Sequence, residues 1–206
     1  MSKTELLKYG NYYHIFNCGI NHCNIFKEQG NYEYFLKLYS KYIDPVADTY
    51  AWVLMPNHFH FLVRVKSIED LKEDFPFLNL SGLQNLTGLK KPSQFFSNLF
   101  NAYTKAFNKR YDRHGSLFER RFKRKKINHI KHLKQVLLYI HNNPVHHGFC
   151  NHPIEYSWNS YLSCISVKST KLKREKVAGW FDNAANFKQL HTQTLNLKKI
   201  EEFLEL

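Results

Sequence analysis

Apolar residues recur along this chain with the two spacings that distinguish strands from helices. Four short runs are typical of strands, the first three rich in aromatic and β-branched residues and the last in basic ones, and they span 12–17, 48–55, 58–65 and 118–127. Apolar side chains at steps of three and four predict a helix at 31–43. The pair Pro56-Asn57 predicts a tight turn between the second and third strands.

Two further helices are predicted from their end signals. Ser93 is suited to cap a helix that runs to about residue 111, and Asn128 to cap a helix at 129–142 that Pro144 must stop. The apolar stripe of this last helix recurs at three, four and three residues and consists of Ile130, Leu133, Leu137 and Ile140. A segment rich in Leu, Asn and Gly at 76–92 predicts a loop.

The predicted order is strand, helix, strand, strand, helix, strand, helix. The first six elements match the split βαβ arrangement, so the fold class is α+β: a ferredoxin-like antiparallel sheet with helices on one face. The last helix is an addition to that plan. We predict one domain at 1–165, followed by a basic, partly helical C-terminal extension at 166–206.

The stretch LMPNHFHFLVRV places two histidines on one strand. Because side chains alternate between the faces of a strand, His58 and His60 share the polar face while Phe59 and Phe61 point to the core. Two imidazoles so placed can converge on one metal ion. The alternative is that they are ordinary surface histidines in a protein that has 12 of them.

The last helix offers a partner for this pair. Tyr139 and Asn143 are four residues apart and lie on one helix face, where a tyrosine can act as a nucleophile and an asparagine can give a carbonyl oxygen to a metal. Asn143 precedes Pro144, which predicts a position at or past the helix end. The alternative is a half-buried aromatic residue followed by an ordinary helix stop.

Charge points to a polyanionic partner. The 206 residues carry a net charge of +13, and an aromatic content of 16% indicates a folded chain rather than a disordered one. Ten basic residues crowd into one segment, with only two acids among them: Lys105, Lys109, Arg110, Arg113, Arg120, Arg121, Lys123, Arg124, Lys125 and Lys126. We predict that they contact DNA phosphates, the alternative being a solvated charged face.

The sequence gives little support to a cysteine zinc protein or to a membrane protein. The four cysteines form no CxxC pair, which argues against a cysteine zinc site, and the chain has no signal-like or membrane-spanning apolar segment. We therefore expect no membrane partner and a cytoplasmic, nucleoid-associated protein.

The motifs LMPNHFHFLV and YIHNNPVHHGF, in this order, resemble the single-tyrosine HUH transposases, closest to the REP-associated tyrosine transposases. The segments YYHIFNCGINHCNIF, GSLFERRFKRKKI and EYSWNSY resemble further parts of that family, over roughly residues 9–165. One departure is Cys18, which stands where the family usually has arginine.

The resemblance implies roles for particular residues. His58 and His60 would be metal ligands with Asn143 as the third, the cofactor would be Mg²⁺ or Mn²⁺, and Tyr139 would be the nucleophile. The implied activity is nicking and rejoining of single-stranded or hairpin DNA through a covalent 5′-phosphotyrosine. Tyr103 and Tyr111, in the basic helix, compete as nucleophiles.

Two other functions stay open from the sequence. A ferredoxin-like module could bind nucleic acid without catalysis, or a metal-dependent nuclease could activate water instead of tyrosine. The sequence also leaves open whether Tyr139 acts in its own chain or in a partner's site, and so whether the protein is a monomer or a homodimer.

Overall fold

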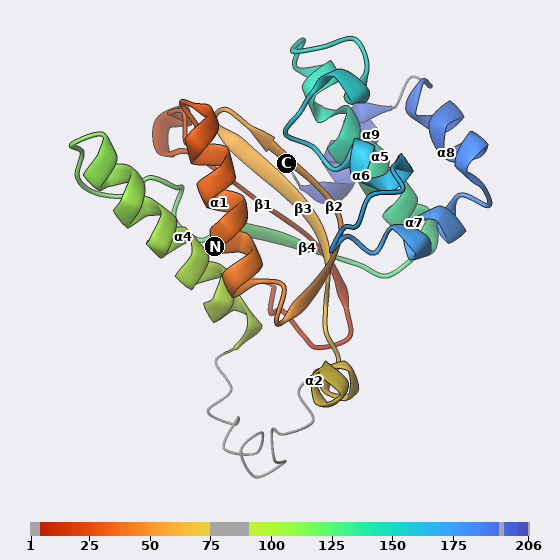
Figure 1. The fold of residues 1–206 in the computed structure, drawn as a ribbon, viewed down its shortest axis with the longest axis horizontal. Helices are drawn as coiled ribbons and strands as arrows, with labels where there is room; N and C mark the ends of the chain where they lie inside the picture. Colours follow the sequence, from red (N-terminus) through yellow and green to blue (C-terminus); the bar gives the residue numbers. More distant parts are fainter. Residues whose placement is uncertain (1–4, 75–90, 194–195, 206) are drawn as a thin grey trace.

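A computed structural model of the chain describes residues 5–74, 91–193 and 196–205. Its centre is a four-stranded antiparallel sheet in the order β2-β3-β1-β4 (Figure 1). The strands are β1 (Tyr12–Cys18), β2 (Ala47–Met55), β3 (His58–Val65) and β4 (Lys123–Ile127). This is the strand order of the split βαβ plan, so the predicted ferredoxin-like α+β fold is confirmed.

Two helices cover one face of the sheet, α1 (Gln29–Tyr42) and α4 (Pro92–Arg110) (Figure 1). Their apolar sides share a core with the residues of β3 that were predicted to point inward, Phe59 and Phe61. A short helix, α2 (Ile68–Asp74), follows β3 and was not predicted. The predicted loop at 76–92 lies almost wholly outside the described residues.

The added helix α5 (Ile130–His146) covers the opposite face. Four later helices gather around it, α6 (Tyr161–Ile165), α7 (Arg174–Trp180), α8 (Ala184–His191) and α9 (Leu197–Leu204). Apolar residues of α7, α8 and α9 are buried in the same core as α5 and the sheet. Short 3₁₀ turns, η1 (Ile20–His22) and η3 (Pro153–Glu155), complete the described elements, and whether the chain divides at residue 165 stays a prediction.

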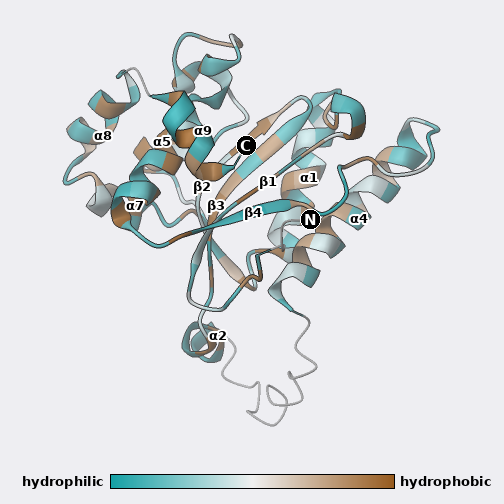
Figure 2. Cartoon of the chain, turned by 180° about the vertical axis from the view of Figure 1, so that it is seen from behind, coloured by the Kyte–Doolittle hydropathy of each residue, from teal (hydrophilic) through white to brown (hydrophobic). Residues whose placement is uncertain are grey.

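The predicted strand at 118–127 is too long. Regular pairing with β1 begins only at Lys123, and Phe118 forms an isolated bridge to Gly19. Arg121 has a φ of 61°, in the left-handed region that interrupts a strand. Figure 2 shows β4 as hydrophilic along much of its length, as suits an edge strand.

Two predicted caps are also wrong. Helix α4 begins at Pro92, with Lys91 at the N-cap position, because proline needs no N–H partner in the first turn and its φ suits a helix. Helix α5 has His129 rather than Asn128 at its N-cap, without a side-chain capping bond. Its predicted stripe is correct except for Ile130, which is 50% exposed at the first turn.

Pro144 does not stop α5, contrary to prediction. The helix runs through it to His146, so Asn143 lies inside the helix rather than at or past its end. Proline removes one N–H from the helical pattern but not the following ones. The N–H of His147 still donates to the carbonyl of Asn143 at 3.1 Å, which completes the last turn.

Candidate active site

Strand β3 carries the histidine pair on the face that α5 covers. Phe59 belongs to the core beneath α1 and α4, whereas Leu62 belongs to the core beneath α5, so alternate residues face opposite layers as predicted. The rings of His58 and His60 lie 5.2 Å apart and nearly perpendicular. Their position next to the β2–β3 turn places them at one end of the sheet.

Helix α5 brings the other two predicted residues to this pair. The Nε2 atom of His58 lies 2.9 Å from Oδ1 of Asn143, and the ring of Tyr139 lies 5.5 Å from that of His60, edge to face. One helical turn separates Tyr139 from Asn143, so both side chains lie on the helix face that is turned to the histidine pair. The structure thus brings together His58, His60, Tyr139 and Asn143, which we call the site cluster.

The competing tyrosines lie elsewhere. Tyr103 is a residue of α4 that is buried in the core on the other side of the sheet, and its hydroxyl donates to the carbonyl of Ile25 at 2.6 Å. The hydroxyl of Tyr111 contacts Glu28 and Asn31 in that same layer. Of the three candidate nucleophiles, Tyr139 alone faces the histidine pair.

Sequence reasoning missed a third histidine. His14, on β1, is fully buried, and its Nε2 lies 2.9 Å from Nδ1 of His60 with the two rings stacked at 5.0 Å. Its Nδ1 is buried without a partner among the described residues. Alternation along 12–17 places His14 on the site face once β1 is paired with β3, but the sequence does not show which strands are neighbours.

A second omission concerns the end of α5. The ring of His147 lies 5.1 Å from that of His58, and the ring of His146 lies 6.1 Å from that of Tyr139. Both were visible in the sequence as part of NNPVHHG. Because Pro144 was predicted to stop the helix, the sequence could not place them against the site.

Burial keeps the site cluster uncharged. It lowers the pKa of His58 to about 4, against the raising effect of Asn143, and it lowers the pKa of His60 well below the usual range. Burial also raises the pKa of Tyr139, with Glu201 adding to the effect and Asn143 opposing it. At neutral pH the imidazoles are therefore neutral, as metal ligands must be, and the phenol keeps its proton.

The donor set fits a divalent cation. Both ring nitrogens of His58 face amide oxygens, Oδ1 of Asn57 at 2.7 Å and Oδ1 of Asn143 at 2.9 Å. A neutral imidazole has only one N–H, so with these amide orientations one contact sets two lone pairs against each other. A divalent cation held by Nε2 of His58 and the oxygen of Asn143 would remove that conflict.

Few other residues could serve as ligands. Within the described ranges, no group of three or more His, Cys, Asp or Glu side chains is arranged to hold a metal ion. The set of His58, His60 and Asn143 has only two such side chains and an amide as the third donor. Imidazole nitrogen with amide oxygen suits a divalent ion that keeps open positions for substrate.

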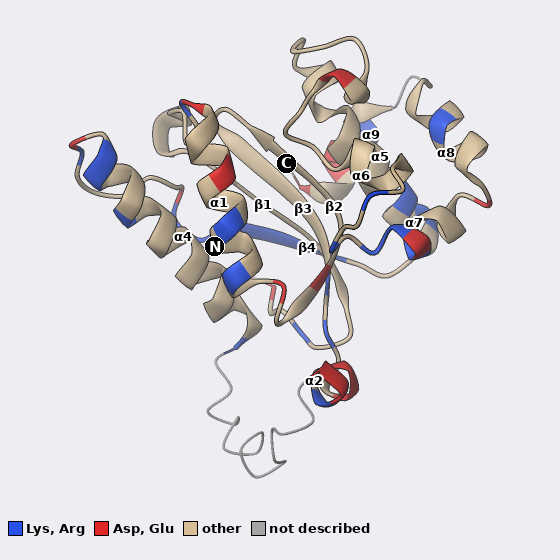
Figure 3. Ribbon diagram, viewed as in Figure 1, with Lys and Arg blue, Asp and Glu red and all other residues tan. Residues whose placement is uncertain are grey.

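The basic residues predicted to contact DNA are spread over three places (Figure 3). Helix α4 and the turn after it hold Lys105, Lys109, Arg110 and Arg113, the segment before β4 holds Arg120 and Arg121, and β4 itself holds Lys123, Arg124, Lys125 and Lys126. Lys123 and Lys125 pair in register with Phe16 and His14, so they share the face of the site cluster.

Some of these cations are engaged within the molecule. Arg110 pairs with Glu28 and Lys125 with Glu205, and the guanidinium of Arg124 lies 4.1 Å from the ring centroid of Phe122. Phe118 and Phe122 are buried, as expected of core residues rather than stacking platforms.

In the described part of the chain, no helix has both the length and the apolar character to cross a bilayer.

Comparisons with known proteins add to this geometry. No protein-family model matches the sequence, and no curated protein matches it. A solved structure of a REP-associated tyrosine transposase bound to a REP hairpin matches with a TM-score of 0.55, at 17% identity, over 80% of this chain and 86% of that one. The resemblance seen in the motifs is thus confirmed at the level of the fold.

Proposed function

We propose that this chain is a metal-dependent DNA strand-transferase that nicks and rejoins single-stranded or hairpin DNA through a covalent 5′-phosphotyrosine. The observation that carries this proposal is the meeting of Tyr139 and Asn143 from α5 with His58 and His60 from β3. The shared fold with a transposase bound to a REP hairpin supports it. The net charge of +13 supports a nucleic-acid substrate.

The proposed chemistry is an exchange of phosphodiester bonds. The phenolic oxygen of Tyr139 attacks the scissile phosphorus, a phosphotyrosine bond forms, and the bond from phosphorus to the 3′ oxygen breaks. The proton that the phenol loses is matched by the one that the leaving 3′ oxygen takes up. Because one phosphodiester replaces another, a 3′-OH can reverse the step, and strands are rejoined without ATP.

The cluster residues have distinct parts in this scheme. His58, His60 and Asn143 would hold Mg²⁺ or Mn²⁺, which supplies stabilisation of the charge that develops on the phosphate. His14 fixes the ring of His60 through the Nε2–Nδ1 contact of 2.9 Å. The phenol of Tyr139 lies beside histidines of its own chain, which supports catalysis within one protomer.

The test is covalent trapping. Protein is incubated with 3′-labelled hairpin oligonucleotides that carry single-stranded flanks, with and without Mn²⁺, and resolved on denaturing gels. A labelled protein band that requires Mn²⁺ is expected, falling to background in Tyr139→Phe because no phenolic oxygen remains. The matched control is Tyr111→Phe, the same change on the other side of the sheet, which should keep the band.

Other results would favour a different function or a different nucleophile. Cutting without a protein-linked band would favour a nuclease that activates water. A band that survives in Tyr139→Phe and disappears in Tyr111→Phe would show that Tyr111 is the nucleophile. Salt-sensitive binding with no cutting of any flank would favour a non-catalytic binding module.

A further inference from the structure

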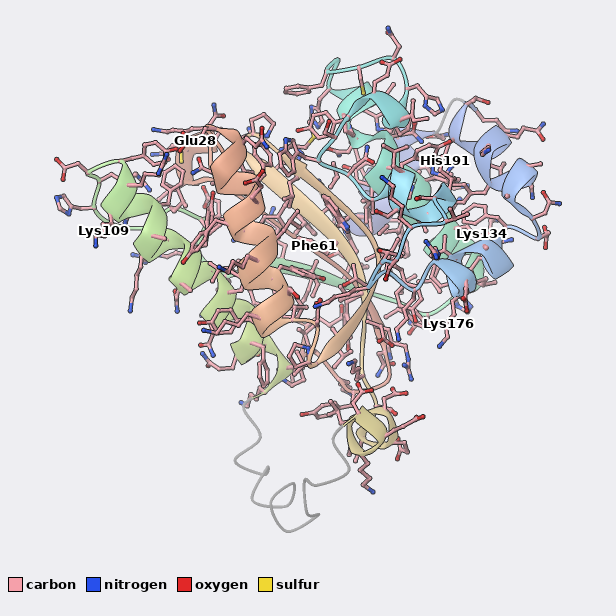
Figure 4. The ribbon with its side chains drawn as sticks, viewed as in Figure 1. Glu28, Phe61, Lys109, Lys134, Lys176 and His191 are labelled. Carbon is pink, nitrogen blue, oxygen red and sulfur yellow. The ribbon has the colours of Figure 1, made fainter. Side chains whose placement is uncertain are left out.

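An open pocket lies beside the β2–β3 turn, and its floor belongs to the core that α1 and α4 cover. It has a volume of about 680 Å³, within the range of sites that bind small ligands. Its lining comes from three places in the sequence, within 24–32, at Pro56 and at 157–158. Glu28, at the start of α1, marks its position in Figure 4. We call it the Trp158 pocket, and the function proposed above does not use it.

Three aromatic rings form a continuous stack in the wall of this pocket. Phe26 stacks on Tyr32 with ring centroids 4.5 Å apart, and Tyr32 stacks on Trp158, also at 4.5 Å. Phe26 and Tyr32 are buried, whereas Trp158 is half-buried at the outer end of the stack. The indole of Trp158 is therefore placed to receive one more planar ring from a ligand.

The backbone holds Trp158 in position before any ligand arrives. The N–H of Leu54 donates to the carbonyl of Trp158 at 2.9 Å, and the next residue, Asn159, forms a bridge to Val53. Trp158 thus lies along the edge of the sheet beside β2. It belongs to the motif EYSWNSY, which has no part in the reaction proposed above. A ring fixed in this way loses little conformational entropy when it binds.

The charged residues of the pocket are already engaged with α4 and the residue after it. Glu28 pairs with Arg110 and accepts from the hydroxyl of Tyr111 at 2.7 Å. The amine of Lys27 lies 4.5 Å from the ring centroid of Tyr111. The lining also contains uncharged polar side chains, Asn24, Gln29 and Ser157. An uncharged planar group with hydrogen-bonding edges suits this lining better than a phosphate or a carboxylate does, and a nucleobase is such a group.

The pocket is next to the site cluster, across the β2–β3 turn. The N–H of Phe26 donates to the carbonyl of Pro56 at 2.9 Å, so the pocket is bonded to the turn. His58 follows two residues later, and its Nδ1 lies 2.7 Å from Oδ1 of Asn57. Because consecutive Cα atoms are about 3.8 Å apart, those of Pro56 and His58 are separated by at most about 7.6 Å. A DNA strand at the histidine pair can therefore reach the pocket with a neighbouring base.

We propose that the Trp158 pocket receives one base of the DNA substrate, turned out of the strand next to the scissile phosphate and stacked on the indole. The proposal rests on the proposed function for the identity of the substrate. Turning a base out of its stack costs least where the base is already unpaired. A base held in the pocket fixes the position of the neighbouring phosphate relative to Tyr139, so the pocket would help to select the phosphodiester that is cut.

The test combines protein variants with abasic DNA. The probe is a hairpin with single-stranded flanks of randomised sequence, in which one flank position at a time lacks its base. Fluorescence anisotropy in EDTA gives the affinities without cleavage. In the wild type, loss of the base at one position should weaken binding by about tenfold, as expected for a base stacked on an aromatic ring. Trp158→Leu should bind the intact probe about tenfold more weakly, with no further loss at that position.

The matched control is Trp180→Leu. It removes another half-buried indole that stacks on a tyrosine, Tyr50, with ring centroids 5.0 Å apart. Trp180 is on α7, whose Lys176 lies on the other side of the molecule from Glu28 (Figure 4). This control should retain the whole tenfold effect of the abasic position. Trp158→Phe keeps a ring for stacking and should retain most of it.

A measurement on the wild type covers the case in which Trp158→Leu does not fold. 5-Iodouracil is placed at the sensitive position, the complex is irradiated, and the crosslinked peptide is identified by mass spectrometry. The peptide should contain Trp158 or Tyr32. A crosslink to any other segment would overturn the proposal.

Two results of the affinity measurements would also overturn it. One is that no abasic position weakens binding to the wild type, and the other is that the sensitive position causes the same loss in Trp158→Leu. Failure of the covalent assay has a different meaning if Trp158 and the sensitive position remain coupled. That combination would refute the proposed transfer reaction and leave the pocket as a base-binding site.

Discussion

Two buried clusters of polar side chains lie on opposite sides of α5, and they differ in how completely their hydrogen bonds are satisfied. One is the site cluster, with His14 beside it. The other, which we call the C-terminal cluster, consists of His141, Ser160 and His191. His141 lies two residues from both Tyr139 and Asn143, and at 100° per residue it points away from them.

In the C-terminal cluster each ring nitrogen has a partner. His191 donates from Nδ1 to the carbonyl of Phe187 at 2.7 Å, so its Nε2 accepts from His141 at 2.9 Å. His141 in turn accepts from the hydroxyl of Ser160 at 2.8 Å, and that oxygen accepts the N–H of Trp52 at 2.8 Å. Every donor is matched by an acceptor.

The site cluster and the histidines beside it have no such complete set of hydrogen bonds. Nδ1 of His14 and Nδ1 of His146 are buried without partners in the described part of the chain, and His58 faces two amide oxygens with one N–H. A complete network needs nothing further, whereas an incomplete one is suited to receive an ion or a substrate. The C-terminal cluster, despite its Ser-His-His order, is thus structural, since its serine is fully buried and already bonded.

The largest expected effect follows from breaking the complete network. His141→Ala leaves Ser160 and His191 with unpaired groups and opens a cavity, so the free energy of unfolding should fall by about 3 kcal/mol. Urea unfolding followed by circular dichroism measures the change. His58→Ala, at the partly exposed edge of the site cluster, should cost about 1 kcal/mol or less. A larger loss for His58→Ala than for His141→Ala would reverse the assignment of structural and functional roles.

In the site cluster, where the hydrogen bonds are incomplete, the larger effect of a substitution should be on metal binding rather than on stability. His58→Ala removes one of the three ligands proposed for the ion and is expected to weaken Mn²⁺ binding by about 100-fold, or about 2.7 kcal/mol. The signal of free Mn²⁺ in electron paramagnetic resonance gives the affinity directly, without any DNA. The control is His114→Ala, which changes an exposed histidine. Equal Mn²⁺ affinities for the two variants would show that Mn²⁺ does not bind at this site.

Most of the site cluster could be predicted because its members lie close together in the sequence. His58 and His60 are two residues apart on one strand, and Tyr139 and Asn143 are four apart on one helix, so local periodicity decides which way they point. The prediction that this strand and this helix meet came from the family resemblance rather than from periodicity.

What could not be predicted depends on contacts between distant segments. His14 joins the site only because β1 lies next to β3, and the C-terminal cluster exists only because α8 packs against α5. Local rules failed where tertiary packing overrode them, as at Pro144, which a helix accommodates when the following N–H groups still find carbonyls. Strand β4 is shorter than predicted because Arg121 takes a left-handed conformation, which composition does not reveal.

The smallest expected effect concerns pH. Burial lowers the pKa of His191 to about 4, and the titratable groups around it, His141, Tyr161 and His152, supply no negative charge near neutral pH. The unfolded chain therefore binds a proton at this position below about pH 6.5, while the folded chain does not. The stabilisation is complete above that pH and is lost as the pH falls towards 4, at up to about 1.4 kcal/mol per pH unit.

His191→Gln isolates this contribution. Its carboxamide can accept from His141 and donate to Phe187 but does not titrate, so the other buried histidines keep their own share of the pH dependence. Between pH 6.5 and 5.5 the wild type should lose about 1 kcal/mol more free energy of unfolding than the variant. Parallel pH profiles would show that α8 leaves α5 before the protein unfolds, and the C-terminal cluster would then not be part of the cooperative core.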